Sequence, residues 1–346
     1  MSTRPTIRDV ATAAGVSRQT VSRVINGDVR VAPETRAQVE SAIAQLDFRP
    51  NVIARSMALG RTHTLACLSP NLTDFTFASI IEGAEAEARQ HGYFLLSSSA
   101  PDPATFAALT EQLVGQRRVD GVMVINPYID GRYHHLSAEV PGLLVGARSR
   151  DPRVASIALD ERRAGETATR HLLSLGHRRL ALIHGPLAED CCQDRNAGFD
   201  LAFQEAGLTV DPALIQAGDW SATSGYEAAQ RLLSQGAPFT ALFAQNDRMA
   251  VGAIRALREA GRRVPDEVSV IGFDDIPLAS YFDPPLTTMR QDMPAIGRTA
   301  AQLLIQRLEH PDQPPAHTAC PAELVVRHST RALEEGRSSL VSPLLP

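Results

Sequence analysis

From His63 onward, short apolar runs alternate with amphipathic stretches of helical length. Continuous apolar runs predict strands that are buried on both faces, and helices between them predict that the strands run parallel. We expect strands at residues 65–68, 93–96, 121–125, 143–145, 180–183, 241–243 and 268–271. We expect helices at residues 76–90, 162–175, 192–206, 222–235, 247–260 and 295–309. The predicted fold class is therefore α/β, with parallel sheets covered by helices on both faces.

About 260 residues of such sequence are too many for one small sheet. We expect two similar lobes in series, divided near Asp160. Ligands bind such sheets beyond the carboxyl ends of the strands, so the cleft between the lobes is the predicted ligand site.

Residues 6–26 have a different pattern, which predicts an all-α head that begins with two short helices around a tight turn. Apolar residues recur at helical spacing in both halves. Thr6 and Asp9 have the spacing of a capping box at the start of the first helix. Gly15 can end that helix, and Ser17 can cap the second. This layout is that of a helix-turn-helix DNA-binding motif, and the alternative is a surface helix with ordinary solvated charge.

The polar face of the second helix carries Arg18, Gln19 and Arg23. Arg can bond guanine O6 and N7 in the major groove, and Gln can bond adenine N6 and N7. Residues 1–61 hold nine Arg against five acidic residues, a balance of +4, whereas the remainder holds 25 Arg against 34 acidic residues. A basic head on an acidic body is the charge distribution expected of a phosphate-contacting module on a sensor.

The head is followed by a predicted hinge helix. Pro33 begins a third helix, and a short segment at 52–59 follows it. Eight residues are too few to hold a helix in water without a partner, so this segment either frays or orders on DNA. We divide the chain into a head with hinge at 1–60, a two-lobed effector-binding and dimerisation domain at 61–334, and a disordered tail at 335–346.

Several classes of protein are excluded by what the sequence lacks. No apolar run approaches the roughly 18 residues of a membrane span, and charged residues interrupt any signal-peptide core near the N-terminus. The four Cys show no C-x-x-C spacing, which suits a reducing cytoplasm, and Cys191-Cys192 is best explained as two ordinary thiols. No P-loop, H-E-x-x-H or G-x-S-x-G element occurs. We therefore expect a cytoplasmic protein with no catalytic residue, metal or cofactor.

Six motifs then occur in a fixed order along the chain. They are Gly-Val-Ser-Arg-Gln-Thr-Val-Ser-Arg-Val-Ile-Asn at 15–26, Arg-Pro-Asn-Val-Ile-Ala-Arg-Ser-Met at 49–57, Leu-Gly-His-Arg-Arg-Leu-Ala-Leu-Ile at 175–183, Asn-Asp-Arg-Met-Ala-Val-Gly-Ala at 246–253, Ile-Gly-Phe-Asp-Asp-Ile-Pro at 271–277 and Pro-Pro-Leu-Thr-Thr-Met-Arg-Gln at 284–291. With these motifs the chain resembles the LacI/GalR family of bacterial transcription regulators. The resemblance implies a helix-turn-helix head, a hinge helix and a two-lobed sensor similar to periplasmic sugar-binding proteins. It also implies a homodimer on a palindromic operator, with a small-molecule effector.

The resemblance implies a role for each polar residue of the second helix. Arg18, Gln19 and Arg23 match base-reading positions, whereas Thr20 and Ser22 match phosphate contacts, which position without specifying. The other head residues predicted to contact DNA are Thr6, Ser17 and Asn26, of which Asn26 either touches a phosphate or caps the helix end.

In the hinge, Ala54 and Met57 match minor-groove positions. A pair of such helices would wedge apolar side chains between base pairs, and the alternative for Met57 is core packing. Asn51 and Arg55 complete the predicted DNA contacts.

For the effector, the resemblance implies one set of matching positions. They are Asn71, Phe75, Arg148, Cys191, Arg195, Trp220, Asn246, Asp274 and Gln291. The set suits a polyol: Asp274 can accept two hydroxyl hydrogens, Arg195 offers a five-donor fork, and Trp220 offers an apolar face. Sugar-binding relatives often place an Asp near Gly146, and this chain has none there. A small sugar is the expected effector, and the alternative is a purine, nucleoside or other effector acting as corepressor.

The leading hypothesis is a ligand-controlled transcription regulator, most often a repressor in this family. A solute-binding protein for transport is a second hypothesis, which the basic head and the missing signal peptide disfavour. A sugar-processing enzyme is a third, which the lack of a nucleophile or paired-acid motif disfavours.

Overall fold

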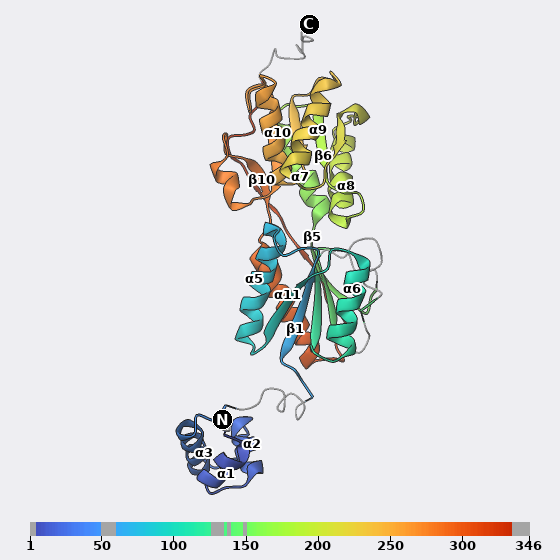
Figure 1. Cartoon of the computed structure of the whole chain (residues 1–346). Coiled ribbons are helices and arrows are strands. Elements are labelled where there is room, and N and C mark those ends of the chain that lie inside the picture. Colours follow the sequence, from blue (N-terminus) through green and yellow to red (C-terminus); the bar gives the residue numbers. More distant parts are fainter. Residues whose placement is uncertain (1–4, 50–59, 126–134, 137–139, 148–150, 334–346) are drawn as a thin grey trace. The chain divides into compact units, whose positions relative to one another are not determined.

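The structure is a computed structural model, which describes residues 5–49, 60–125, 135–136, 140–147 and 151–333 (Figure 1). It divides into two compact units, Met1–Thr62 and His63–Pro346, which are described separately below. The predicted hinge segment at 52–59 and the predicted tail at 335–346 lie outside the described residues.

The first unit consists of short helices around a small apolar core. Its described helices are α1 (Ile7–Ala13), α2 (Arg18–Ile25) and α3 (Pro33–Gln45). Val10, Val21 and Val39, one from each helix, are fully buried in this core. The predicted helix-turn-helix is confirmed.

Local backbone conformation and hydrogen bonds define the start of α1 and the turn between α1 and α2. Gly15 has a φ of +64°, a left-handed conformation that glycine adopts at no steric cost. The carboxylate of Asp9 accepts the backbone N–H of Thr6 at 2.8 Å, at the start of α1. The Ser17 hydroxyl oxygen accepts the N–H of Thr20 at 3.1 Å and caps α2, as the sequence predicts.

In the second unit, the first lobe is built on a sheet of described strands in the order β11-β5-β4-β3-β1-β2, all parallel to their neighbours. The strands are β1 (Thr64–Ser69), β2 (Phe94–Ser99), β3 (Gly121–Ile125), β4 (Gly142–Val145), β5 (Ala155–Leu159) and β11 (His317–Cys320). Helices α5 (Phe75–Gln90) and α11 (Met293–Glu309) pack together on one face. Helix α6 (Pro103–Thr110) and the π-helical turn η1 (Glu111–Gly115) cover the other face (Figure 1).

The second lobe repeats this plan with strands in the order β12-β10-β9-β8-β6-β7. Only β12 is antiparallel to its neighbour among the described pairs. The strands are β6 (Leu180–His184), β7 (Ile215–Ala217), β8 (Ala241–Ala244), β9 (Ser269–Asp274), β10 (Thr287–Arg290) and β12 (Glu323–Val325). The helices are α7 (Glu161–Ser174) and α8 (Asp190–Glu205) on one face, α9 (Ala222–Ser234) and α10 (Asp247–Glu259) on the other, and the 3-10 turns η3 (Pro212–Leu214) and η4 (Pro277–Tyr281).

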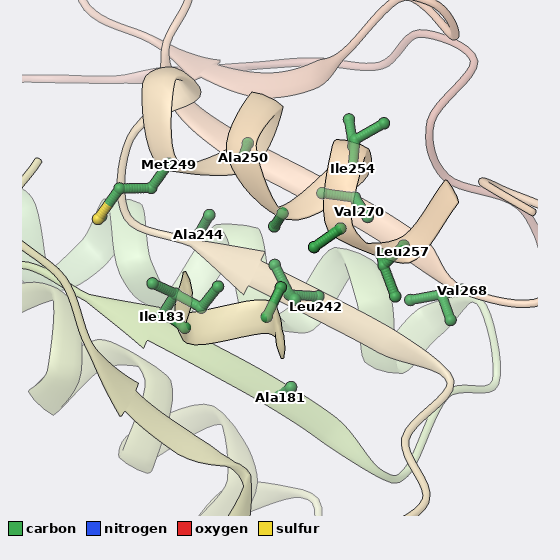
Figure 2. Packing of buried hydrophobic residues seen from close by; sticks show 14 of the residues in the cluster. Ala181, Ile183, Leu242, Ala244, Met249, Ala250, Ile254, Leu257, Val268 and Val270 are labelled. Carbon is green, nitrogen blue, oxygen red and sulfur yellow. The ribbon is translucent and has the colours of Figure 1, made fainter. Parts of the chain in front are cut away.

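Helix α10 is anchored on its sheet along its whole length. Figure 2 shows Met249, Ala250, Ile254 and Leu257 of α10 packed above side chains of β6, β8 and β9. Because dense apolar packing holds both ends of α10, the residues at its start have fixed positions. That start faces the site described below.

The lobes are not in series, and this expectation is wrong. The chain leaves the first sheet after β5, returns to it as α11 and β11, and enters the second sheet again as β12. The helix expected at 295–309 therefore covers the first lobe, although it follows the second lobe in sequence. Apolar periodicity reports local burial but does not identify the sheet that a strand joins.

The other expected strands and helices of the second unit are present, with ends that differ from the expected ones by at most three residues. The elements that sequence patterns missed include β5, α6, β7, β10 and the short edge strands β11 and β12. Within the part of the chain that the structure describes, no helix is long and apolar enough to span a membrane.

Candidate effector pocket and DNA-binding face

A cavity lies between the two lobes of the second unit, beyond the carboxyl ends of β3, β4 and β9. Strand ends supply Ile125, Val145 and Asp274 to its wall. Of the nine residues predicted to bind the effector, seven line the cavity: Phe75, Cys191, Arg195, Trp220, Asn246, Asp274 and Gln291. The cavity therefore brings together residues that are more than 200 positions apart in sequence.

The two remaining predicted residues are placed otherwise. Asn71 is absent from the described wall, and its side-chain oxygen accepts the N–H groups of Thr73 at 3.1 Å and Asp74 at 2.7 Å. Asn71 thus shapes the loop that precedes α5. Arg148 lies outside the described residues.

Arg195 is the most heavily bonded side chain of the cavity. Its Nε and Nη2 donate to the two carboxylate oxygens of Glu161 at 2.7 and 3.1 Å, and Nη1 donates to the backbone oxygen of Gln245 at 2.6 Å. The guanidinium also stacks 3.6 Å above the ring centroid of Phe273. Only 6% of the Arg195 side chain is exposed. At least three of its five N–H donors are therefore engaged before any ligand binds.

The bidentate pair depends on a close approach of α7 and α8. A Cβ on Gly198 would lie 2.1 Å from the backbone oxygen of Arg162, so only glycine permits this crossing. The approach places Glu161, at the start of α7, against Arg195 on α8. Glu161 was not predicted as a site residue, because its partner lies 34 positions away.

Asp274 and Gln291 meet at the cavity wall. The side-chain nitrogen of Gln291 donates to Asp274 Oδ1 at 2.7 Å. Burial raises the pKa of Asp274 well above its usual range, although the nearby Arg195 lowers it. Gln291 lies in the segment that crosses from the second lobe to α11, so this hydrogen bond links the pocket to a lobe connection.

Asn246 and Trp220 form a second bonded pair. Asn246 Oδ1 accepts the N–H of Met249 at 2.8 Å, which caps α10, and its Nδ2 donates to the backbone oxygen of Trp220 at 3.0 Å. The Trp220 indole N–H donates to Glu189 Oε1 at 3.0 Å. Glu189 also lines the cavity and is buried. The ring face of Trp220 is thus held by polar contacts at both its backbone and its indole nitrogen.

The cysteines at the start of α8 are free thiols. Burial raises the pKa of Cys191 well above its usual range and raises that of Cys192 to about 12. Both are therefore protonated and poorly reactive at neutral pH. Within the described residues, no group of His, Cys, Asp and Glu is arranged to hold a metal ion.

An ion pair joins the lobes beside the cavity. Arg248 Nη1, at the start of α10, lies 2.9 Å from Asp74 Oδ2, at the start of α5. Both residues line the cavity, and neither was predicted from the sequence. The pair is partly exposed, so its contribution to stability is at most about 1 kcal/mol.

In the first unit, α2 presents the predicted DNA-reading side chains to solvent. Arg18, Gln19 and Arg23 are exposed, whereas Val21 and Val24 are buried against the other helices. The half-buried members of the predicted set are Thr20 and Ser22, and the exposed ones that remain are Thr6, Ser17 and Asn26. Residues Asn51, Ala54, Arg55 and Met57 lie outside the described residues.

Comparisons with known proteins match both units of the chain to described families. Residues 6–51 match the family model described as bacterial regulatory proteins, lacI family, and residues 169–330 match a periplasmic binding protein-like domain. The HTH-type transcriptional repressor PurR of Haemophilus influenzae (strain PittEE) is 36% identical over 337 residues, which are 95% of this chain and 99% of the relative. This chain belongs to the lacI family.

Solved structures of lacI-family proteins share the fold over nearly the whole chain. The lac repressor dimer bound to operator and the anti-inducer ONPF is 32% identical, with a TM-score of 0.87 over 95% of this chain and all of that one. The complex of the transcriptional regulator CelR with cellobiose is 33% identical, with a TM-score of 0.73 over 94% of this chain and all of that one.

Four charged residues of the cavity wall were not predicted from the sequence. These are Asp74, Glu161, Glu189 and Arg248. Each lies at or next to a helix start, where a charged residue is common and does not by itself indicate a ligand. A buried Arg such as Arg195 is expected to pair with an acidic residue, but the sequence does not show which acidic residue that is.

Proposed function

We propose that this chain is a cytoplasmic transcriptional repressor that binds a palindromic operator as a homodimer and changes its affinity for DNA when a small effector fills the pocket. The observation that carries the proposal is the combination of two sites in one chain. One unit has a helix-turn-helix with exposed Arg18 and Gln19, and the other has a cavity between two lobes. The solved lac repressor, a dimer on its operator, supports the same arrangement for this chain.

A neutral, hydroxyl-rich effector, a small sugar, suits the pocket best. The described wall holds four carboxylates, those of Asp74, Glu161, Glu189 and Asp274, but only two guanidinium groups. Both guanidinium groups are ion-paired with carboxylates of the wall. Carboxylates accept hydrogen bonds, so an effector that brings hydroxyl donors fits this wall. The rings of Phe75 and Trp220 offer apolar faces to a sugar ring.

A purine is the second candidate, because PurR relatives are 36% identical over 95% of this chain. A flat base can stack on the same rings, and its N–H groups can donate to Glu189 or Asp274. Under this candidate the effector acts as a corepressor.

The experiment combines operator selection with an effector panel. Selection from random duplex DNA should give one sequence with two-fold symmetry, because two recognition helices read two half-sites. D-glucose, D-ribose, cellobiose, guanine and adenine are then tested for a change in the Kd for that operator and for a shift in Tm. One of the sugars should change the operator Kd by about 5–150-fold, the usual range of allosteric coupling.

If only guanine or adenine changes the operator Kd, the effector is a purine and the sugar proposal is wrong. A selected sequence without two-fold symmetry, or no selected sequence at all, would contradict the proposed regulator itself.

The homodimer also predicts the effect of a surface change. Phe94 is 76% exposed and lies on β2, the edge strand of the first sheet. An exposed aromatic on an edge strand suits a surface that a second copy covers. Phe94→Asp should weaken self-association at least about tenfold by sedimentation equilibrium, because a buried Phe contributes about 1.5–3 kcal/mol. Val29→Asp, at an exposed apolar residue of the head, is the control and should leave the dimer intact. An unchanged dimer in Phe94→Asp would remove β2 from the interface.

A further inference from the structure

Asp247 is a fully buried carboxylate directly beside the pocket. It is the first residue of α10, has no exposed surface, and is absent from the described cavity wall. Oδ1 accepts the Thr288 hydroxyl at 2.6 Å, and Oδ2 accepts the backbone N–H of Ile276 at 2.9 Å. Both carboxylate oxygens are thus bonded to other elements of the second lobe.

Each chain segment that Asp247 joins supplies at least one pocket residue. Helix α10 is capped by Asn246, strand β9 ends at Asp274, two residues before Ile276, and strand β10 leads from Thr288 to Gln291. One carboxylate therefore ties together the three chain segments that carry Asn246, Asp274 and Gln291.

The segment that carries Asp274 requires such a restraint. Asp274 has a φ of +107° and Asp275 a φ of +55°, a left-handed region that side chains other than glycine adopt only when their surroundings hold them. On one side, Asp247 holds the next residue, Ile276. On the other side, Arg290 and Arg327 each hold the Asp275 carboxylate at 2.6 Å.

The space around Asp247 is closed. A Cβ on Gly272, in strand β9, would lie 2.2 Å from Asp247 Oδ1. The carboxylate therefore occupies the position that any side chain at residue 272 would need. This contact gives a way to displace Asp247 without changing it.

Asp247 also bears on the aromatic wall through its two neighbours. Asn246 Nδ2 and Arg248 Nε donate to the backbone oxygen of Trp220 at 3.0 and 2.9 Å. Trp220 itself has a left-handed φ of +71°. The start of α10, which Asp247 fixes, thus holds the backbone of the pocket's tryptophan.

We propose that Asp247 is a positioning residue of the effector pocket, which holds Asp274 and Trp220 in place through its bonds to Ile276 and Thr288 and never touches the effector. The proposal rests on the proposed function, because it assigns the pocket to an effector. Its primary test needs no effector, so the two can fail separately.

The primary test is acrylamide quenching of tryptophan fluorescence in the full-length protein. Trp220 is the only tryptophan of the chain, so the signal reports on the pocket alone. Asp247→Ala and Gly272→Ala should both raise the Stern–Volmer constant at least about twofold, because Trp220 loses its fixed backbone. Thr288→Val removes one of the two bonds with little change of shape and should give a smaller rise.

Asp247→Asn is the conservative variant. Its amide oxygen can accept the Ile276 N–H while its NH₂ donates to the Thr288 hydroxyl, which can also accept. Quenching in Asp247→Asn should therefore stay close to wild type. Leu172→Ala, which creates a cavity under α7 in the core of the same lobe and leaves the packing of α10 unchanged, should lower Tm without a change in quenching.

A second experiment uses the sugar or purine of the panel above that shifts the Tm of the wild type, and measures the Kd of each variant for that compound. Asp247→Ala should weaken it at least about tenfold, Asp247→Asn should restore it, and operator affinity without effector should be unchanged. Quenching that is equal in wild type, Asp247→Ala and Gly272→Ala would overturn the positioning role. A rise in Leu172→Ala as large as in Asp247→Ala would overturn it too, since general loosening of the lobe would then explain both.

Discussion

Arg195→Ala is expected to abolish the effector response and to destabilise the second unit, while operator binding by the head survives. Removal of the guanidinium leaves the Glu161 carboxylate, whose side chain is 10% exposed, without its charge partner. Breaking a buried ion pair from one side costs about 3–5 kcal/mol. Urea unfolding of the purified variant measures this loss, and operator Kd with and without the effector measures the response.

A double variant separates the two effects. Arg195→Met with Glu161→Gln removes both charges and keeps similar volumes, so most of the stability should return. The effector response should not return, because the remaining Arg195 donors are lost. A double variant that responds like the wild type would show that Arg195 has only a structural role.

Changes on α2 are expected to alter which sequence the protein prefers. Arg18→Ala and Gln19→Ala should each cost about 1–3 kcal/mol at one base pair of each half-site and relax the preference there. Repeated operator selection with each variant identifies that base pair. The contrast is Arg55→Ala, which should weaken binding to all sequences alike and lower the salt dependence. If Arg18→Ala selects the same operator as the wild type, the assignment of α2 as the reading helix is wrong.

The fold was largely predictable because its signals are local. The runs at β1, β3, β6, β8 and β9 are apolar and buried along nearly their whole length. Strands β11 and β12 have four and three residues of mixed exposure, so they lack that signal. The packing of α11 on the first lobe was not predictable, since it depends on which of the two sheets has a face that other helices leave uncovered.

The pocket residues that belong to sequence motifs were predictable, whereas those defined only by their contacts with other side chains were not. Asp274 and Asn246 lie in recognisable segments at strand ends. Glu161 and Glu189 are defined only by their contacts with Arg195 and Trp220, which the fold brings together across 34 and 31 positions. The left-handed backbone of Asp274 also follows from its surroundings and not from its residue type.

The interleaving of the lobes sets the order in which they can be completed during synthesis. The first sheet needs β11 at its edge, and one of its faces needs α11, both of which follow most of the second lobe in the chain. On the ribosome, β1 to β5 therefore emerge with one apolar face covered by α5 but not by α11, and that face is completed only after about 130 further residues, roughly 7–26 s of translation. Neither sheet is complete until the last strands, β11 and then β12, have emerged, and neither lobe is a contiguous piece of the gene that could be inherited or exchanged alone.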